Sequence, residues 1–286
     1  MLTPGEVRAL LSAHGLAPSK SFGQNFVVDQ NTVRKVVRDA GIGPADLVVE
    51  VGPGLGSLTL ALRAAGARVV AVEVDAGMVR ALTSVVGDDA QVSIVHADAL
   101  HVDYAALTGG EPAALVSNLP YNVATPLLMT ALRTQVFSRL LVMVQREVGE
   151  RWIASPGAPL YGGVSVKIAA LASATIAARV SRNAFYPVPN VDSVTVLLEP
   201  RPQPATPDVD GLFALVDAGF SQRRKRLRNT LSGLGYAPAD VEAALTNVGL
   251  SAGARAEELA LPEWLQLAAA LRDGDPHVLP GTPGRA

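Results

Sequence analysis

An alternation of short apolar segments with helical segments begins at Asp46, and it constrains the fold more than any other feature of this sequence. Five apolar segments are predicted strands: residues 47–51, 68–75, 92–95, 113–116 and 140–144. Strands that alternate with helices in this way predict a parallel sheet with helices on both faces. The predicted class is therefore α/β with a Rossmann-like sheet, in which ligands bind at the carboxyl ends of the strands.

The residues that follow the predicted strands are typical of a ligand site. Gly52, Gly54 and Gly56 stand at every second position between a strand and a helix. A backbone without side chains can approach a ligand closely there, and the first N–H groups of the helix attract an anion. Glu73 ends the second strand, where a carboxylate can accept from both hydroxyls of a ribose. Asp98 follows the third strand and is placed to accept from an adenine amine.

Two cofactors compete for this glycine loop. A dinucleotide site has the pattern Gly-x-Gly-x-x-Gly, but the third glycine position holds Ser57 or Thr59, depending on the alignment. Glu50 precedes the loop, and its negative charge suits an ammonium better than a pyrophosphate. S-adenosylmethionine carries an amino group, a carboxylate, a ribose and an adenine but no phosphate, so we favour it over NAD.

Residues 117–122, with the sequence SNLPYN, follow the fourth predicted strand. The Asn118 side-chain oxygen and a neighbouring backbone carbonyl can both accept hydrogen bonds from one exocyclic amine, and Tyr121 offers a face for stacking. Adenine presents such an amine on a flat ring. The same residues also fit an ordinary strand-to-helix turn, because Asn and Pro are common in turns. The glycine loop upstream favours the ligand site.

The net charge of −2 argues by itself against a nucleic-acid partner, but the charge is unevenly distributed. Five cations fall within six residues: Arg223, Arg224, Lys225, Arg226 and Arg228. Such a cluster either binds phosphates or forms a solvated helical face.

The remaining composition excludes several classes of protein. Cysteine is absent, so disulfides and thiolate metal sites are excluded, and the four His residues lack the spacing of metal ligands. No metal is therefore expected. The sequence shows neither a transmembrane segment nor a secretory signal, which predicts a cytoplasmic protein with no membrane partner.

Two regions of different pattern predict the domain organisation. Thr3 and Glu6 form a capping box for a helix that ends near Gly15, and a second helix is expected from Asp29 to Gly41. The proline-rich residues 200–207 are a predicted linker, and small helices follow it. We expect an S-adenosylmethionine-binding domain over residues 1–203, a small all-helical domain over 204–272 and a disordered tail over 273–286.

With these motifs in register, the chain resembles the ribosomal RNA adenine N6-dimethyltransferases, above all the bacterial branch that acts on small-subunit (16S) rRNA. The resemblance spans residues 18–230. It is carried by residues 23–26 (GQNF), 50–56, 118–121, 145–148, 161–166, 185–193 and 220–229, the last predicted to be a basic helix. Seven motifs in this order are highly specific, although each is weak alone.

The resemblance implies a fold and an activity. The fold is that of a class I S-adenosylmethionine-dependent methyltransferase with a C-terminal helical RNA-binding domain. The activity is methyl transfer to the N6 amines of two adjacent adenosines in a 16S rRNA hairpin, which leaves S-adenosylhomocysteine as product. The implied partner is small-subunit rRNA within a partly assembled 30S subunit, and the implied state is a monomer.

The resemblance also implies roles for individual residues. Cofactor contacts are implied for Asn25, Val27, Gly52, Glu73, Asp98 and Asn118. The implied catalytic set is Asn118, Leu119, Pro120, Tyr121 and Phe185, in which Tyr121 and Phe185 stack on the target base. Core filling is the other interpretation of Phe185. Val27 stands where Leu is common in the family, but this contact is usually made by the backbone. RNA binding is implied for the basic cluster of residues 223–228.

Three alternatives remain open at this point. The sister group methylates large-subunit (23S) rRNA and confers macrolide resistance, but the Tyr161-Gly162 motif and the length of the helical tail favour the small-subunit branch. The chain could also act as a ribosome-assembly factor whose occupancy matters more than its catalysis. Methylation of DNA adenine is a lesser option. The sequence does not say whether free rRNA or a particle is the substrate.

Overall fold

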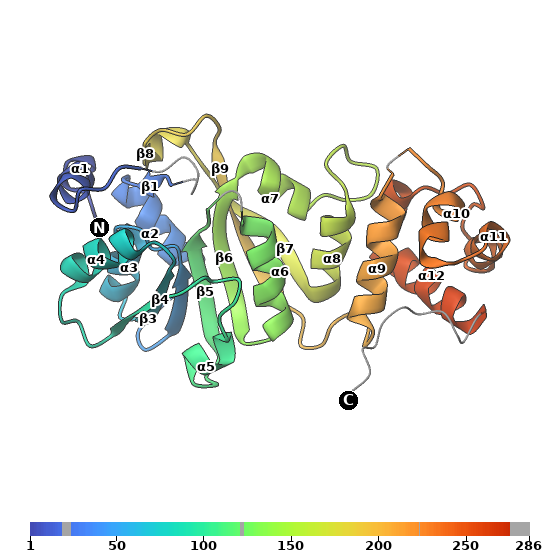
Figure 1. The fold of residues 1–286 in the computed structure, drawn as a ribbon, viewed down its shortest axis with the longest axis horizontal. Helices are drawn as coiled ribbons and strands as arrows, with labels where there is room; N and C mark the ends of the chain where they lie inside the picture. The colour runs from blue at the N-terminus through green and yellow to red at the C-terminus, as the bar shows by residue number, and fades with distance from the viewer. Residues whose placement is uncertain (19–23, 121–122, 223, 275–286) are drawn as a thin grey trace. The chain divides into compact units, whose positions relative to one another are not determined.

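The structure is a computed structural model that describes residues 1–18, 24–120, 123–222 and 224–274. By their contacts the residues divide into two compact units (Figure 1). The first comprises Met1–Gly149 and Ala174–Pro200, and the second comprises Glu150–Ser173 and the chain from Arg201 onward.

The first unit is built on a seven-stranded sheet with the strand order β4-β3-β2-β5-β6-β9-β7. Its strands are β2 (Leu47–Val51), β3 (Arg68–Glu73), β4 (Val92–His96), β5 (Ala113–Asn118), β6 (Phe137–Gln145), β7 (Ala172–Val180) and β9 (Ser193–Pro200). The pairs from β4 to β6 are parallel, whereas β9 is antiparallel to β6. A separate two-stranded sheet pairs β1 (Phe26–Val27) with β8 (Phe185–Tyr186). The five predicted strands and their parallel arrangement are confirmed.

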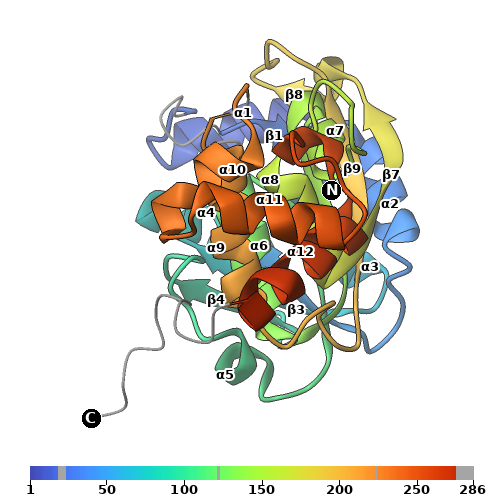
Figure 2. The ribbon, with the colours of Figure 1, turned by 90° about the vertical axis from the view of Figure 1, so that its right-hand side faces the viewer.

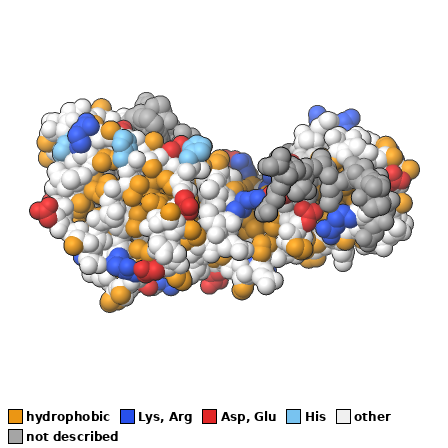
Figure 3. Space-filling model, turned by 60° about the horizontal axis from the view of Figure 1, so that its bottom comes forward, with side chains coloured by type: hydrophobic (Ala, Val, Ile, Leu, Met, Phe, Trp, Pro, Cys, Tyr) orange, Lys and Arg blue, Asp and Glu red, His pale blue; other side chains and the backbone are white. Residues whose placement is uncertain are grey.

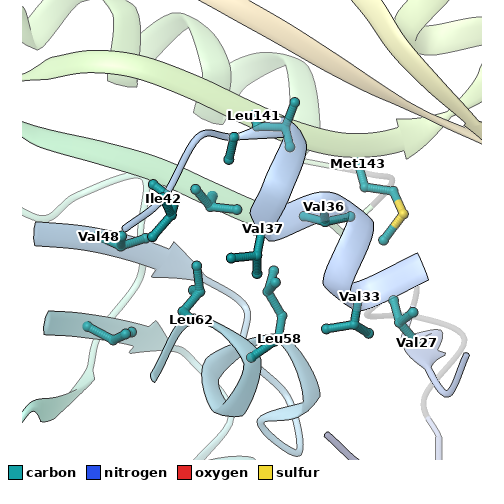
Figure 4. Packing of buried hydrophobic residues seen from close by; sticks show 14 of the residues in the cluster. Val27, Val33, Val36, Val37, Ile42, Val48, Leu58, Leu62, Leu141 and Met143 are labelled. Carbon is teal, nitrogen blue, oxygen red and sulfur yellow. The ribbon is translucent and has the colours of Figure 1, made fainter. Parts of the chain in front are cut away.

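Helices cover both faces of this sheet, as predicted. The helices that begin in the first unit are α1 (Pro4–Ala13), α2 (Gln30–Asp39), α3 (Ser57–Ala64), α4 (Ala76–Val86), α5 (Tyr104–Thr108), α6 (Ala124–Thr134) and α7 (Arg146–Trp152), which runs from the first unit into the second. On one face, Val36 and Val37 of α2 pack with Leu58 and Leu62 of α3 above β2 (Figure 4). Beneath them, β2 and β3 are buried almost along their whole length, and most of their residues are apolar.

Side-chain caps fix where several of these helices begin. Thr3 Oγ1 accepts a hydrogen bond from the Glu6 backbone N at 3.3 Å, and Glu6 Oε2 accepts one from the Thr3 backbone N at 2.7 Å. This capping box satisfies N–H groups that have no partner within the helix. Asp29 caps α2 in the same manner through Thr32 N at 2.9 Å. Both predicted helix starts are confirmed.

The second unit is helical (Figure 2). Its helices are α8 (Gly163–Leu171), α9 (Val209–Phe220), α10 (Leu227–Thr230), α11 (Pro238–Asn247) and α12 (Leu261–Gly274). Trp264 is fully buried at its centre, and Tyr161 donates a hydrogen bond to the Leu259 carbonyl at 2.6 Å. Val166 of α8 shares this core with Val216 of α9. The division by contacts therefore groups α8 with the C-terminal helices, whereas the boundary proposed from the sequence lies at 203/204.

The basic segment does not form the continuous helix that the sequence suggested. Helix α9 ends at Phe220, a turn closed by a 2.9 Å hydrogen bond from Lys225 N to Gln222 O follows, and α10 begins at Leu227. Arg226 has extended dihedral angles (φ −73°, ψ 148°), which interrupt the helix there. Helix α12 continues to Gly274, and the remainder of the expected disordered tail lies outside the described residues.

Charged side chains of both signs are interspersed on the face drawn in Figure 3. Ion pairs of the first unit include Arg63 with Asp89 at 2.8 Å and Arg68 with Glu111 at 2.5 Å. Within the described part of the chain, no helix combines the length and apolar character needed to cross a membrane.

Candidate active site and cofactor cavity

A cavity of about 300 Å³ lies at the carboxyl ends of β2, β3, β4 and β5. Strands β2 and β5 are neighbours although β3 and β4 separate them in the sequence, so the strand order reverses between them. Open α/β sheets bind ligands at this kind of position. The lining brings together all six predicted cofactor residues and three of the predicted catalytic ones, with Asn118 in both sets: Asn25, Val27, Gly52, Glu73, Asp98, Asn118, Leu119 and Pro120.

The glycine loop forms one wall of this cavity. Gly54 has φ 55°, in the left-handed region that side chains rarely adopt, and a Cβ there would also stand 3.0 Å from the Phe26 ring. Gly56, with φ 89°, precedes the first residue of α3, and a Cβ there would meet Leu82 at 2.6 Å. These two positions therefore require glycine. The loop delivers the N-terminal end of α3 to the cavity, where its N–H groups can bind an anion.

Glu73 ends β3 with its carboxylate folded onto backbone N–H groups. Its oxygens accept from Val74 N at 2.9 Å, Asp75 N at 3.0 Å and Gly54 N at 3.2 Å. Burial raises the pKa of Glu73, and these hydrogen bonds lower it in part. A carboxylate held by three N–H groups has a fixed orientation and can still accept further hydrogen bonds.

Asp98 stands in a different environment at the end of β4. It is exposed, and it accepts from Leu100 N at 2.9 Å and from His101 Nδ1 at 3.0 Å. The backbone hydrogen bond from Leu100 is the largest cause that lowers the pKa of Asp98 below its usual value, and His101 adds to it. This carboxylate is therefore ionised at neutral pH.

Glu50 is buried beneath the glycine loop, with 2% of its surface exposed. Burial raises its pKa from 4.5 to about 8, and the nearby Glu73 contributes in the same direction. Thr59 Oγ1 donates to Glu50 Oε2 at 2.5 Å. Glu50 is negatively charged by its residue type, but the structure corrects this expectation. With a pKa of about 8 the carboxyl is mostly protonated at pH 7, because ionising a buried acid is unfavourable.

Hydrogen bonds also fix the orientation of the Asn118 side chain. Its Nδ2 donates to the Asn25 carbonyl at 3.0 Å, so the amide oxygen is the atom available to accept from a ligand. The Leu119 N–H donates to the Met143 carbonyl at 3.0 Å, and Val51 N donates to Ser117 Oγ at 2.8 Å. These bonds hold the end of β5 between its two neighbouring strands.

The two predicted stacking residues are Tyr121 and Phe185, of which Tyr121 lies outside the described residues. Phe185 belongs to β8, pairs with Val27 and is only 2% exposed within the core that Val33 and Met143 also form. A ring buried in this way offers no face to a base. The structure therefore supports the other interpretation of Phe185, core filling.

The basic cluster belongs to the second unit. Arg224, Lys225 and Arg226 are exposed in the turn between α9 and α10, whereas Arg223 lies outside the described residues. Arg228 differs from them because it forms an ion pair with Glu242 of α11.

Sequence reasoning missed part of the lining. Val7 lies on α1 and Leu2 just before it, and Val74 and Leu100 follow β3 and β4 next to the predicted acids. The proximity of Val74 to Glu73 and of Leu100 to Asp98 in the sequence could have indicated the last two. The contribution of α1 follows only from its packing against the glycine loop, because its sequence shows no more than an amphipathic helix.

Comparisons with known proteins agree with this fold and this arrangement of residues. Residues 16–273 match the family model described as ribosomal RNA adenine dimethylase. A Streptomyces avermitilis protein named ribosomal RNA small subunit methyltransferase A is 48% identical over 276 residues, which cover 94% of this chain and 93% of the relative. The Thermobifida fusca protein of the same name is 46% identical over 275 residues, with 94% and 95% covered.

Solved structures show the same fold. The crystal structure of the 23S rRNA methyltransferase ErmE matches with a TM-score of 0.67 and 25% identity, over 86% of this chain and 99% of that chain. A dimethyladenosine transferase from Plasmodium falciparum matches with a TM-score of 0.68 and 22% identity, over 83% and 94%. The fold is thus that of the Rossmann-like class I methyltransferases. More narrowly, the chain belongs to the ribosomal RNA adenine dimethylase family.

Proposed function

We propose that this protein transfers methyl groups from S-adenosylmethionine to the N6 amines of two adjacent adenosines in a 16S rRNA hairpin, within a partly assembled 30S subunit. The observation that carries the proposal is the fixed Asn118 amide at the edge of a cavity whose other groups suit this cofactor. Membership of the family and the names of the similar bacterial proteins support it. Action on a ribosomal particle places the protein in the cytoplasm, and we expect it to act as a monomer.

The groups around the cavity fit the parts of S-adenosylmethionine. The N-terminal end of α3 suits a carboxylate, and the ordered carboxylate of Glu73 suits the hydroxyls of a ribose. The ionised Asp98 suits the amine of an adenine. We propose further contacts from Asn25, Val27, Gly52 and Asn118. When bound, the cofactor supplies a methyl group on an electrophilic sulfonium.

Residues at the end of β5 position the adenine amine. An adenine amine is a weak nucleophile because its lone pair is delocalised into the ring. If Asn118 Oδ1 and the Leu119 carbonyl accept its two N–H groups, they localise the lone pair and aim it. The catalysis then comes from preorganised dipoles and from approach geometry. After the first transfer one N–H remains to be held, and after each transfer the product ammonium loses its extra proton without a tuned base.

The target adenosine has to reach Asn118, and the phosphates of the RNA have to be bound by cations. We propose that Pro120 and Tyr121 form the entry next to Asn118 and that the Tyr121 ring stacks on the unpaired adenine, a contact worth roughly 1–3 kcal/mol. Exposed Arg224, Lys225 and Arg226 are proposed to hold RNA phosphates, which gives affinity without base specificity.

Methylation of 23S rRNA is the second candidate, because the ErmE structure shares the fold. The identity of 25% to that protein is well below the 48% to a protein named for the small subunit, and this favours 16S rRNA. A role in assembly without catalysis is a weaker candidate, because a pure RNA-binding module would not need an amide held toward a cofactor cavity.

Labelled S-adenosylmethionine tests the proposal. The protein is incubated with 30S particles from a strain that lacks the modification, with 50S particles and with free 16S rRNA, and nucleosides are analysed by mass spectrometry. We expect N6,N6-dimethyladenosine at two adjacent positions of 16S rRNA, formed best in the particle. Label confined to 23S rRNA would support the second candidate, and the absence of label in any RNA would support the assembly role.

A further inference from the structure

Helix α1 contributes to the cavity although it lies outside the residues that match the family model, which begin at residue 16. Two residues, Val7 on the helix and Leu2 just before it, are part of the cavity lining. Val7 is fully buried and Leu2, which directly precedes the helix cap, is 8% exposed, and both line the cavity. No motif of the family resemblance includes them.

The position of α1 is fixed at three places. The Leu2 backbone N donates to Ser57 Oγ, on the first residue of α3, at 3.3 Å. In the middle of α1, Val7 and Leu11 share an apolar cluster with Met78 of α4. At the end of the helix, His14 Nε2 lies 3.0 Å from Ser84 Oγ of α4. Contacts at both ends and in the middle make α1 a part of this unit's packed structure (Figure 1).

A fourth contact connects α1 with the small sheet behind the cavity. The Arg8 guanidinium lies 5.8 Å from the centre of the Tyr186 ring. Tyr186 pairs in β8 with Phe26 of β1, and Phe26 lines the cavity. Helix α1 therefore spans from the N-terminal end of α3 to the β1–β8 sheet.

We propose that α1 and the residues before it form a wall of the cofactor site and that the Leu2 side chain contacts the aliphatic aminoacyl part of S-adenosylmethionine. Val7, which is fully buried, supports Leu2 from the same apolar cluster. The reason is the position of Ser57. A ligand carboxylate is expected at the first N–H groups of α3, and the Leu2 backbone is bonded to the first residue of that helix. The apolar carbons that precede the carboxylate then lie against the Leu2 side chain. This inference rests on the proposed function and adds a group of cofactor-binding residues to it.

Binding of S-adenosylhomocysteine to the full chain, measured by isothermal titration calorimetry, tests the wall. Leu2→Ala removes apolar contact with the ligand, so we expect the Kd to rise by about 3- to 10-fold. Leu2→Phe fills part of the cavity, and we expect it to raise the Kd by about 10-fold or more. Thermal unfolding of each variant reports whether the fold is kept.

Leu11→Ala is the matched control. Leu11 is buried in the same cluster of α1, at 5% exposure, but it does not line the cavity. We expect this variant to lose thermal stability and to keep the Kd within about twofold. A Kd raised as much by Leu11→Ala as by Leu2→Ala would overturn the wall, because general docking of α1 would then explain both.

The same titrations separate this inference from the proposed function. If the unchanged chain binds S-adenosylhomocysteine and both Leu2 variants bind it equally tightly, the wall is wrong and the proposed function stands. If the unchanged chain does not bind S-adenosylhomocysteine, both fall together.

Discussion

The carboxyl edge of the sheet in the first unit, where the parallel strands end, and the turn between α9 and α10 in the second are built in opposite ways. At the sheet edge, Asn118 and Glu73 are each held by backbone groups at about 3 Å. In the turn, Arg224 and Lys225 are exposed. Aiming at one nitrogen of one base requires fixed geometry, whereas holding phosphates requires mainly charge. The difference predicts that substitutions at the edge change turnover and substitutions in the turn change affinity.

Asn118→Ala should have the largest effect of any change discussed here. It removes the proposed acceptor for the adenine amine, and losing one preorganised hydrogen-bonding group typically costs about 10²- to 10³-fold in rate. The Kd for S-adenosylhomocysteine should rise by several-fold at most, because the other cavity groups remain. Single-turnover incorporation of labelled methyl groups into 30S particles measures the rate.

Asn31→Ala serves as the control for this change, because Asn31 is exposed on α2 and is absent from the cavity lining. It should retain the full rate. If Asn118→Ala also transferred methyl groups at the full rate, the proposed mechanism and the contrast between edge and turn would both be wrong.

The features that the sequence predicted correctly are those that local pattern determines. The apolar runs before Gly52 and Asn118 gave the strands, and because parallel strands share one carboxyl edge, the residues after them had to meet. The caps at Thr3 and Asp29 were readable because a helix start depends on a few adjacent residues.

The features that the sequence could not give depend on partners far along the chain. Phe185 is buried because β8 pairs with β1, about 160 residues earlier, and no local pattern in either segment indicates that pairing. Glu50 is neutral because the fold buries it, so its charge could not be assigned from its residue type. The basic run showed its charge correctly, but charge does not decide whether a segment forms a helix or a turn.

A double substitution in the turn tests the second half of this contrast, that the exposed cations contribute to RNA affinity and not to turnover. Arg224→Ala with Lys225→Ala removes two exposed cations, and each phosphate contact contributes about one to the slope of log Kd against log salt. We expect that slope to fall by up to about 2 and binding at low salt to weaken by about 10-fold or more, while the single-turnover rate at saturating RNA stays unchanged. Fluorescence titration of a labelled hairpin RNA at several salt concentrations measures the slope and the affinity at low salt. Single-turnover incorporation of labelled methyl groups measures the rate.

The control for the turn is Arg68→Ala, which removes a cation that Glu111 already pairs at 2.5 Å. Its salt slope should match that of the unchanged chain. An unchanged slope in the double variant of the turn would indicate that these cations form a solvated surface and nothing more.

Glu50→Gln tests whether the Glu50 carboxyl is buried and protonated in the folded protein. The pKa of Glu50 is about 8 in the folded protein and 4.5 ordinarily. The folded state therefore holds a proton that the unfolded state lacks between these values. This group should therefore lower the free energy of unfolding as pH rises from about 5 to 8, by up to about 1.4 kcal/mol per pH unit. The Gln variant cannot ionise, so its stability should depend less on pH in that window.

Urea unfolding at pH 6, 7 and 8 measures this difference. Glu111→Gln is the control, because Glu111 is exposed and its pKa is lowered by Arg68, so its effect should not grow with pH in this window. Parallel pH profiles for Glu50→Gln and the unchanged chain would mean that Glu50 is ionised at neutral pH and that the edge is more hydrated than its burial indicates.

The smallest effect is expected for Arg228, which the sequence grouped with the RNA-binding cations. Its guanidinium already pairs with Glu242, and both side chains are about one-third exposed (37% and 34%). An ion pair of this exposure contributes up to about 1 kcal/mol. Arg228→Ala should therefore lower the free energy of urea unfolding by less than about 1 kcal/mol and leave the salt slope of RNA binding unchanged. If the slope instead falls by about 1, as it should for Lys225→Ala alone, Arg228 leaves Glu242 to bind phosphate, and the RNA-binding surface extends from the turn onto α10.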